Sequence, residues 1–430
     1  MRIAVVGLGK IGLPLAVQYA SKGHDVVGVD INAALVDVVN RGEEPFPGEA
    51  ELATRLREAV DAGRFRATTD YAQAIPSAQA VVVVVPLVVD DTTGQPDFRA
   101  LEAATADIAT HLTRGTLISY ETTLPVGTIR SRWKPALESG SGLTEGRDFD
   151  LVFSPERVLT GRVFADLREY PKLVGAMSEA SARAARRFYE AVLDFNERTD
   201  LPQGNGVWDL GSPEAAELAK LAETTYRDVN IALANQFAVF AEAHNIDVHR
   251  VIEASNSQPY SHIHRPGVAV GGHCIPVYPR LYLFNDPSAT VVRAAREANV
   301  AMPGHAVDLL EDAHGTLAGA RVVVLGASYR GGVKETAFSG VFPLVRALRE
   351  RGAEVAVHDP LFSPDELRAL GLVPYALGEP VDAVILQADH AEYRALSPDT
   401  LPGVRTVVDG RHVLPAQRWA GVTLVRIGGG

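Results

Sequence analysis

The single cysteine of this 430-residue chain, Cys274, stands in the segment GGHCIP, residues 271–276. A chain with one cysteine forms no internal disulfide. The thiol therefore serves either as a small apolar side chain in the interior or as a reactive group. Two glycines and a histidine directly before it favour an exposed, positioned nucleophile. Such a thiol could hold an aldehyde as a covalent adduct and carry it through a second oxidation.

A glycine-rich turn follows the first apolar run of the sequence. Gly7, Gly9 and Gly12 are spaced so that the first permits a tight turn, the second lets a pyrophosphate approach the backbone, and the third lets helix and strand pack closely. The helix that begins there offers free N–H groups and a favourable dipole. Asp30 ends the next predicted strand, where an acid binds the ribose hydroxyls and repels a 2′-phosphate. We predict binding of NAD rather than NADP; the alternative is a glycine turn without a cofactor.

Two further strand ends carry polar groups that could assist the thiol. Glu156 lies in the segment SPER, at the carboxyl edge of the predicted sheet, where open α/β sheets bind ligands. Its carboxylate could act as a general base on water, or it could form a salt bridge with a neighbouring arginine. The segment ETT, residues 121–123, ends another strand at the same edge. Its hydroxyls could orient a substrate alcohol or a water, or cap a turn.

Lys220 lies on a predicted helix, one turn before Thr224, and its near neighbours are apolar. A lysine on a helix is usually solvated, but these neighbours predict that this turn is buried. A buried lysine loses its proton or pairs with an anion.

Three blocks of sequence must position these residues. The first alternates β-rich runs with helical stretches, which implies parallel βαβ units. Its run Val81–Val85 is wholly apolar, as expected of a strand covered on both faces. The predicted strands of this block are Arg2–Gly7, Asp25–Asp30, Gln79–Pro86, Gly115–Thr123 and Phe149–Glu156.

The second block is a single long helix that starts at Ser212-Pro213-Glu214 and keeps an apolar three-four spacing through Ala243. A helix of about 30 residues joins domains or forms a subunit interface, and we predict both. The third block starts near Gly319 and resembles the first. Its predicted elements are strands Arg321–Gly326, Ala353–Asp359, Val381–Leu386 and Val404–Asp409, helix Val341–Arg351, and a loose tail at Gly428–Gly430.

These blocks predict an α/β fold of two Rossmann-like, doubly wound domains joined by a long central helix. The predicted divisions are 1–200 for NAD binding, 201–302 for a helical dimerisation region carrying Lys220 and Cys274, and 318–430 for a C-terminal α/β domain. The turn Gly326-Ala327-Ser328 lacks the full glycine pattern, so we expect no second NAD there.

The net charge of −12 argues against a nucleic-acid or anionic-membrane surface. No apolar stretch approaches the roughly 20 residues that span a bilayer. The N-terminal strand lacks the features of a signal peptide, and the sequence fits a reducing cytoplasm.

Five motifs occur in order along the chain: GxGxxG from Gly7, TTLPxGT from Thr122, SPERxxxG from Ser154, AExxK from Ala216 and GGHCIP from Gly271. With these motifs the chain resembles, over nearly its whole length, the UDP-glucose/GDP-mannose dehydrogenase family of nucleotide-sugar 6-dehydrogenases. Segment 226–232 is most similar to the branch that acts on UDP-N-acetyl-mannosamine and UDP-N-acetyl-glucosamine.

The resemblance implies a two-step, four-electron oxidation of the sugar C6 alcohol to a carboxylate with two NAD, and a homodimer formed through the central helix. It further implies that Cys274 attacks the aldehyde, Glu156 activates the water that hydrolyses the thioester, Lys220 stabilises the oxyanion, and Thr123 orders water or substrate. It also implies that the C-terminal domain binds the UDP-sugar. We predict substrate contacts from Arg157, Lys220, Asn230, Gly272, Arg330 and Lys334. We predict NAD contacts from Gly7, Gly9, Lys10, Ile11, Gly12, Asp30, Pro86 and Thr123, and no metal site.

Four positions depart from the family pattern. Thr224 replaces an asparagine, Tyr278 an aspartate, Ala337 an arginine, and Leu87-Val88 a Thr-Pro pair. Arg330 or Lys334 could substitute for the missing arginine. The departures fit either a coherent subfamily with the same chemistry, or an altered substrate or hydrolysis step.

Several functions stay open beside a UDP-N-acetyl-hexosamine 6-dehydrogenase. They are a UDP-glucose or GDP-mannose 6-dehydrogenase, a two-electron β-hydroxyacid-type dehydrogenase that needs no cysteine, and a nucleotide-sugar binder with impaired catalysis.

Overall fold

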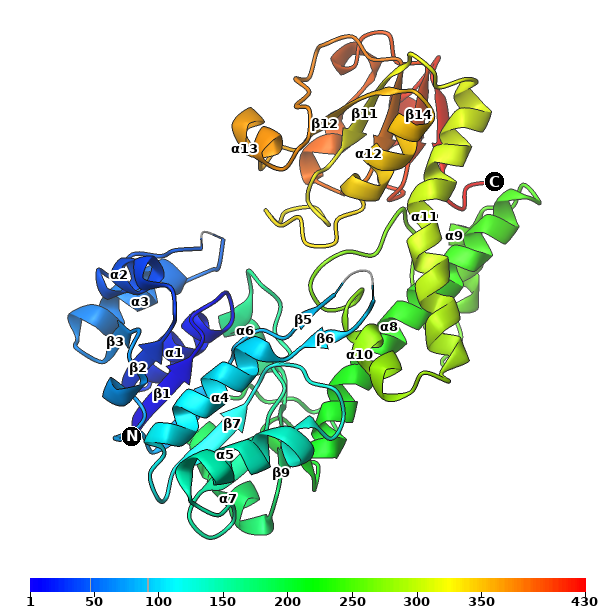
Figure 1. Ribbon diagram of the computed structural model, residues 1–430. Coiled ribbons are helices and arrows are strands. Elements are labelled where there is room, and N and C mark those ends of the chain that lie inside the picture. Colours follow the sequence, from blue (N-terminus) through cyan, green and yellow to red (C-terminus); the bar gives the residue numbers. More distant parts are fainter. Residues whose placement is uncertain (47, 91–92) are drawn as a thin grey trace. The chain divides into compact units, whose positions relative to one another are not determined.

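The computed structural model describes residues 1–46, 48–90 and 93–430. By internal packing the chain forms two units, Met1–Glu223 with Arg280–Asn285, and Thr224–Pro279 with Asp286–Gly430. Each contains one main β-sheet (Figure 1). The three-part division expected from the sequence stays a prediction.

The first unit is built on an eight-stranded sheet in the order β10-β9-β8-β7-β4-β1-β2-β3. All its strand pairs are parallel except β8 with β9, which is antiparallel. The strands are β1 (Arg2–Val6), β2 (Asp25–Val29), β3 (Phe65–Thr68), β4 (Ala80–Val83), β7 (Leu117–Tyr120), β8 (Asp150–Phe153), β9 (Lys172–Ala176) and β10 (Val207–Asp209). Strands β5 (Val88–Val89) and β6 (Pro96–Asp97) form a separate antiparallel pair. The five strands predicted for this block are confirmed, with shorter ends.

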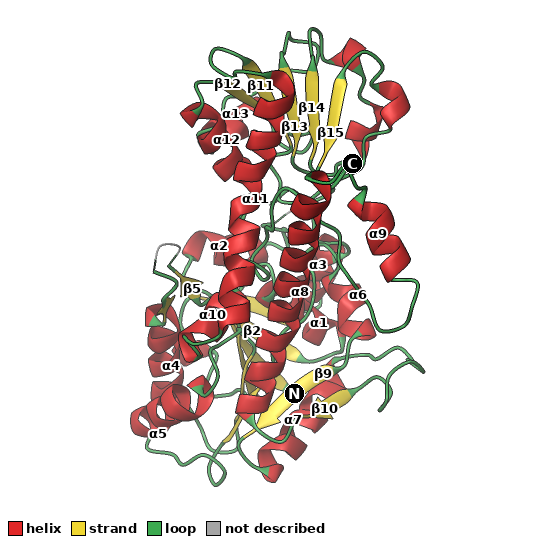
Figure 2. Cartoon of the chain, turned by 90° about the vertical axis from the view of Figure 1, so that its right-hand side faces the viewer, coloured by secondary structure: helices red, strands yellow, loops and turns green. Residues whose placement is uncertain are grey.

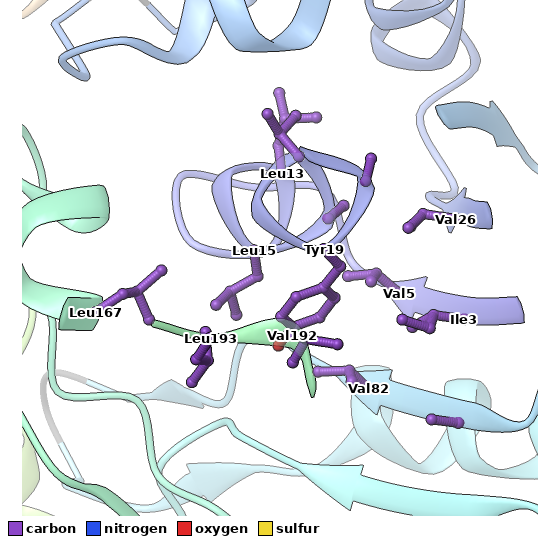
Figure 3. Close-up of a cluster of buried hydrophobic side chains, with 14 of the residues drawn as sticks. Ile3, Val5, Leu13, Leu15, Tyr19, Val26, Val82, Leu167, Val192 and Leu193 are labelled. Carbon is purple, nitrogen blue, oxygen red and sulfur yellow. The ribbon is translucent and has the colours of Figure 1, made fainter. Parts of the chain in front are cut away.

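Helices cover both faces of this sheet. Along β1, Ile3 and Val5 enter one apolar cluster while Ala4 and Val6 enter another, because successive side chains of a strand point to opposite faces. In Figure 3, Leu15 and Tyr19 point from α1 towards Val192 and Leu193 in the first cluster. The helices are α1 (Gly12–Ser21), α2 (Ala33–Asn40), α3 (Leu52–Asp61), α4 (Arg99–His111), α5 (Lys134–Ser141), α6 (Val163–Glu169) and α7 (Glu179–Val192).

The predicted long helix is confirmed as α8 (Pro213–Glu242), and Ser212 Oγ accepts the N–H of Ala215 at its start. The second unit contains a parallel five-stranded sheet in the order β12-β11-β13-β14-β15 (Figure 2). Its strands are β11 (Arg321–Leu325), β12 (Glu354–His358), β13 (Ala383–Leu386), β14 (Thr406–Asp409) and β15 (Thr423–Arg426). The remaining helices are α9 (Val248–Ser255), α10 (Tyr278–Asn285), α11 (Thr290–His314), α12 (Val341–Glu350) and α13 (Pro364–Ala369).

The expectation of a loose C-terminal tail is wrong at Gly428. Its N–H donates to Glu242 Oε1 at 2.6 Å, and its carbonyl accepts the N–H of Val248 at 2.8 Å. A Cβ at Gly428 would lie 2.3 Å from Val248, so glycine permits this close approach. No local pattern in the sequence indicates these non-local hydrogen bonds.

Within the three ranges that the structure describes, no helix has the length and apolar character needed to cross a membrane.

Candidate active site

Each of the three motif positions in the N-terminal turn favours glycine for a different steric reason. Gly7 has φ of 93°, a conformation that side chains disfavour. A Cβ at Gly12 would lie 1.8 Å from the carbonyl oxygen of Gly7, so only glycine lets α1 pack on this turn. A Cβ at Gly9 would meet nothing within 4 Å, which leaves the backbone open to an approaching group. These are the three roles that a pyrophosphate-binding turn requires.

Asp30 fixes this turn from the end of β2. Its Oδ2 accepts the N–H of Leu8 at 2.8 Å and its Oδ1 accepts the N–H of Asn32 at 2.9 Å. A carboxylate has about four acceptor positions, so it retains capacity for ribose hydroxyls. Ile11 precedes α1 without a side-chain cap, Lys10 is exposed, and Pro86 lies exposed beyond β4. The donor set and the open glycine therefore fit NAD.

The segment after β7 is tied to its surroundings by two residues. Thr122 Oγ1 donates to the carbonyl of Val85 at 2.6 Å, which joins the loops after β7 and β4. Glu217 of α8 accepts the N–H groups of Gly127 at 2.5 Å and Ile129 at 3.0 Å. Thr123 is buried between these anchors.

A buried cluster of charges lies at the edge where β7 and β8 end. Lys172 Nζ lies 2.7 Å from Glu121 Oε2 and 2.8 Å from Glu156 Oε2. Because β9 runs antiparallel to β8, its first residue returns to the edge where β8 stops. The Tyr189 hydroxyl donates to Glu121 Oε1 at 2.7 Å. We call Glu121, Lys172 and Glu156 the acid–lysine–acid cluster.

The two carboxyls of this cluster differ electrostatically. Burial, the largest cause, raises the pKa of Glu121 to about 7 despite the charge of Lys172. Burial acts the same way on Glu156, but the charge and hydrogen bond of Lys172, with a contribution from Lys220, outweigh it and lower its pKa. The two acids together raise the pKa of Lys172 against the effect of its burial. The cluster therefore presents Glu156 as a carboxylate.

The remaining predicted residues of the first unit lie nearby. Arg157 pairs with Glu223 of α8 at 2.8 Å, and its N–H donates to Glu156 Oε1 at 2.7 Å. Lys220 is buried, as predicted. The ion pair of Glu156 is with Lys172, so the alternative of an arginine partner is wrong. Glu156, Arg157 and Lys172 line a small pocket together with Pro155, Asp166, Leu167, Tyr170, Pro171 and Leu193.

Cys274 belongs to the second unit and is partly exposed on a loop. Before it, the N–H of Gly272 donates to the carbonyl of Ala337 at 2.8 Å, and Gly272 packs on the ring of Tyr329. The carbonyl of Cys274 accepts the N–H of Tyr278 at 2.9 Å. The glycines thus permit close packing on one side of the thiol-bearing loop.

The other predicted site residues of the second unit, Asn230, Arg330 and Lys334, each contact a different neighbour. Asn230 Oδ1 accepts the N–H of His264 at 2.9 Å. Arg330 Nε donates to the Tyr329 hydroxyl at 3.1 Å, and exposed Lys334 pairs with Glu366 at 2.5 Å.

The site also contains residues that sequence reasoning missed. Local patterns predict no strand at β9, and they therefore indicate no role for Lys172. Glu121 and Glu217 lie within the motifs, but the motifs indicate no role for their carboxylates. The sequence does contain one signal for this cluster. Lys172 directly precedes the apolar run LVGA, which indicates a buried cation that needs acidic partners.

The fold and the glycine turn with its acid define a class, the NAD-binding dehydrogenases. The sequence matches three domain profiles described as the NAD binding domain (residues 1–193), the central domain (214–301) and the UDP binding domain (323–416) of the UDP-glucose/GDP-mannose dehydrogenase family. The chain belongs to this family. It is an NAD-dependent nucleotide-sugar dehydrogenase, an oxidoreductase acting on a CH–OH group.

Named relatives span nearly the whole chain. The UDP-N-acetyl-D-mannosamine dehydrogenase of Pyrococcus horikoshii is 35% identical over 96% of each chain. An NDP-N-acetyl-D-galactosaminuronic acid dehydrogenase of Ralstonia nicotianae is 34% identical over 97% of each. The solved structure of the Pyrococcus horikoshii UDP-D-ManNAc dehydrogenase aligns with a TM-score of 0.89 at 33% identity, covering 100% of this chain and 99% of the other.

Proposed function

We propose that this protein oxidises the C6 alcohol of a UDP-N-acetyl-hexosamine to a carboxylate through a cysteine-bound intermediate. The observation that carries the proposal is the near-full-length similarity to dehydrogenases named for N-acetylated nucleotide sugars. Cys274 and Glu156 supply the side chains that such a reaction requires. The runner-up substrates are UDP-glucose and GDP-mannose.

The proposed reaction consists of two oxidations and one hydrolysis. In the first oxidation the C6 alcohol loses a hydride from carbon and a proton from its hydroxyl, and becomes the aldehyde. Bound NAD supplies the hydride acceptor for both oxidations and is held by the glycine turn and Asp30. Cys274 Sγ adds to the C6 aldehyde, and its proton passes to the aldehyde oxygen to give a thiohemiacetal. Loss of a hydride and a proton converts this adduct to a thioester. Water then attacks the carbonyl carbon, Glu156 takes a proton from the water, and the carbon–sulfur bond breaks to release the acid and the thiolate.

Other side chains support these steps in the proposal. Lys220 stabilises the oxyanion that forms at the carbonyl, an effect worth a few kcal/mol in sites of this kind. Thr123 orders water or substrate. Arg157, Asn230, Gly272, Arg330 and Lys334 contact the nucleotide sugar. Two copies of the chain associate through α8, and the protein works in the cytoplasm.

The deciding experiment counts NADH formed per sugar consumed with a panel of UDP- and GDP-sugars. Two NADH per UDP-N-acetyl-hexosamine, with the acid as product, is the expected result. Cys274→Ser should abolish acid formation while leaving the Kd for NAD unchanged. One NADH per sugar, unaffected by Cys274→Ser, would instead identify a two-electron dehydrogenase. Sugar binding without NADH would identify a binder.

A second experiment examines the hydrolysis step separately. Glu156→Gln should still complete both oxidations, but only once per protein chain. Its amide cannot take a proton from water, so the thioester is not hydrolysed. A thioester should then accumulate on Cys274. Intact-protein mass spectrometry should detect the added mass, and Glu156→Gln/Cys274→Ser should carry none.

A further inference from the structure

The acid–lysine–acid cluster holds two carboxyls and one ammonium in an almost dry place. The side chains of Lys172 and Glu156 are 5% and 10% exposed, and that of Glu121 is fully buried. An unpaired charge in such surroundings is costly, and a cation within hydrogen-bond distance offsets much of the cost. The single positive charge of Lys172 cannot balance the negative charges of two carboxylates. The cluster therefore favours keeping one of the two carboxyls protonated.

The geometry indicates which carboxyl takes that proton. Glu121 is the deeper of the two, and it lies beside Tyr189, whose hydroxyl is also 2.7 Å from Ser119 Oγ. Glu156 is nearer to solvent and also accepts the N–H of Arg157. Burial of charge is penalised most at Glu121, so the proton resides there and Glu156 stays ionised.

Other titratable groups face the cluster from neighbouring elements. Tyr189 comes from α7, Tyr19 from α1 and Lys220 from α8. Arg157, beside Glu156 in the chain, is paired with Glu223. Burial, the largest cause, keeps the pKa of both tyrosines well above its ordinary value, so neither tyrosine competes for charge near neutral pH. Lys172 forms an ion pair with both acids, and the charge of Lys220 also lowers the pKa of Glu156.

We propose that Lys172 is a positioning residue that orients Glu156 and keeps it ionised as the base of the hydrolysis step, while Glu121 holds the proton of the cluster and leaves the charge of the ammonium to Glu156. The inference rests on the proposed function of Glu156. In the hydrolysis, the proton leaves water for Glu156, and Lys172 keeps its own protons throughout. Neither Lys172 nor Glu121 touches the reacting atoms.

Two substitutions should affect the titration midpoint of Glu156 differently, which a purely structural role would not produce. Lys172→Met removes the cation, so the midpoint of Glu156 and the acidic limb of the pH profile of acid formation should rise by about one unit or more. Glu121→Gln resembles the protonated acid that Glu121 already is where Glu156 titrates, so it should leave both unchanged. Lys172→Arg keeps a cation and should restore both.

The titration of Glu156 is measured directly on the full chain labelled with ¹³C at the glutamate side-chain carboxyl. Its resonance is assigned by its loss in Glu156→Gln. Lys22→Met is the matched control, because Lys22 pairs with Asp194 on the surface, and it should leave the midpoint of Glu156 unchanged. If Lys172→Met does not fold, Lys172→Met/Glu121→Gln leaves Glu156 as the one ionisable group of the cluster, and its midpoint should rise there as well.

A Glu156 midpoint unmoved by Lys172→Met, or lowered by Glu121→Gln, overturns the inference. The titration needs no substrate, so it tests the coupling of the two side chains even if the protein forms no acid. Absence of acid formation would overturn the proposed function and leave the titration result standing by itself.

Discussion

Asp30 and Asp359 follow the second strand of their respective sheets, and each fixes the turn after the first strand. Asp30 accepts one backbone N–H on each oxygen. Asp359 Oδ2 accepts the N–H groups of Ala327 and Ser328 and contacts His390 Nε2 at 3.1 Å, while Oδ1 accepts that of Leu361. The fully buried Asp359 has its acceptor positions used within the protein, whereas the half-buried Asp30 keeps some for a ligand.

Asp30→Asn tests this difference at the residue scale. The amide keeps one oxygen for a backbone N–H but removes the negative charge that repels a 2′-phosphate. We expect kcat/KM with NAD to fall by about tenfold, the effect of one lost charged hydrogen bond, and the ratio of NADP to NAD activity to rise. Steady-state kinetics with both cofactors measure this. An unchanged ratio would show that Asp30 does not set the cofactor preference.

The glycine turn and α1 form one element in which two glycines of the same motif have opposite steric surroundings. Gly12→Ala would place a methyl group 1.8 Å from a backbone oxygen, so we expect a loss of about 3 kcal/mol or more in the free energy of unfolding. Gly9→Ala meets nothing within 4 Å and should fold normally, yet weaken NAD binding because the methyl group blocks the pyrophosphate. Chemical denaturation and calorimetric titration with NAD separate the two effects. Equal destabilisation by both substitutions would contradict this account.

Glu217 connects α8 to the loop that carries Thr123. Burial, its largest influence, raises the pKa of Glu217 to about 7 from 4.5, against its two backbone hydrogen bonds. A raised pKa means that the folded state holds the proton more tightly than the unfolded state. The wild-type protein therefore loses stability as the pH rises from about 4.5 to 7.

Glu217→Gln does not titrate, and its amide resembles the protonated acid. The variant and the wild type should have similar unfolding free energies near pH 4.5. At pH 8 the variant should be the more stable, by at most about 3 kcal/mol at roughly 1.4 kcal/mol per pH unit. Its activity should fall, because only one of the two loop N–H groups keeps an acceptor. Urea unfolding across this pH range provides the measurement, and a gap that does not grow with pH would contradict the burial argument.

Local patterns in the sequence were sufficient for the elements with strong periodicity. The start of α8 at Ser212, the apolar strand β4 and the glycine turn each depend on neighbouring residues, and each is confirmed. The antiparallel return of β9 depends on pairing with β8, which no local pattern encodes. The ion pairs of Lys172 follow from that pairing, and the contact of Gly428 with Glu242 is equally non-local.

At the scale of the whole molecule, α8 presents apolar side chains to solvent. Tyr226, Leu233, Phe237 and Phe240 are exposed, and their spacing of seven, four and three residues places them on one face of the helix. A monomer gains nothing from exposing a stripe of large apolar residues, whereas a symmetric dimer buries the same stripe of both copies. This stripe supports the proposed association of two copies through α8.

A charge placed in the stripe should separate the copies. Leu233→Glu/Phe240→Glu puts two carboxylates on each copy of the α8 face, so association would bury unpaired like charges at a cost of several kcal/mol. Sedimentation equilibrium should show the wild type at twice the chain mass and the variant at the chain mass. Val373→Glu, at an exposed apolar position outside α8, serves as the matched control and should leave the dimer intact. Circular dichroism melting verifies that the variant chains fold. A folded Leu233→Glu/Phe240→Glu variant that stays dimeric would place the subunit interface elsewhere, because two buried carboxylates per copy exceed what a standard interface tolerates without partners.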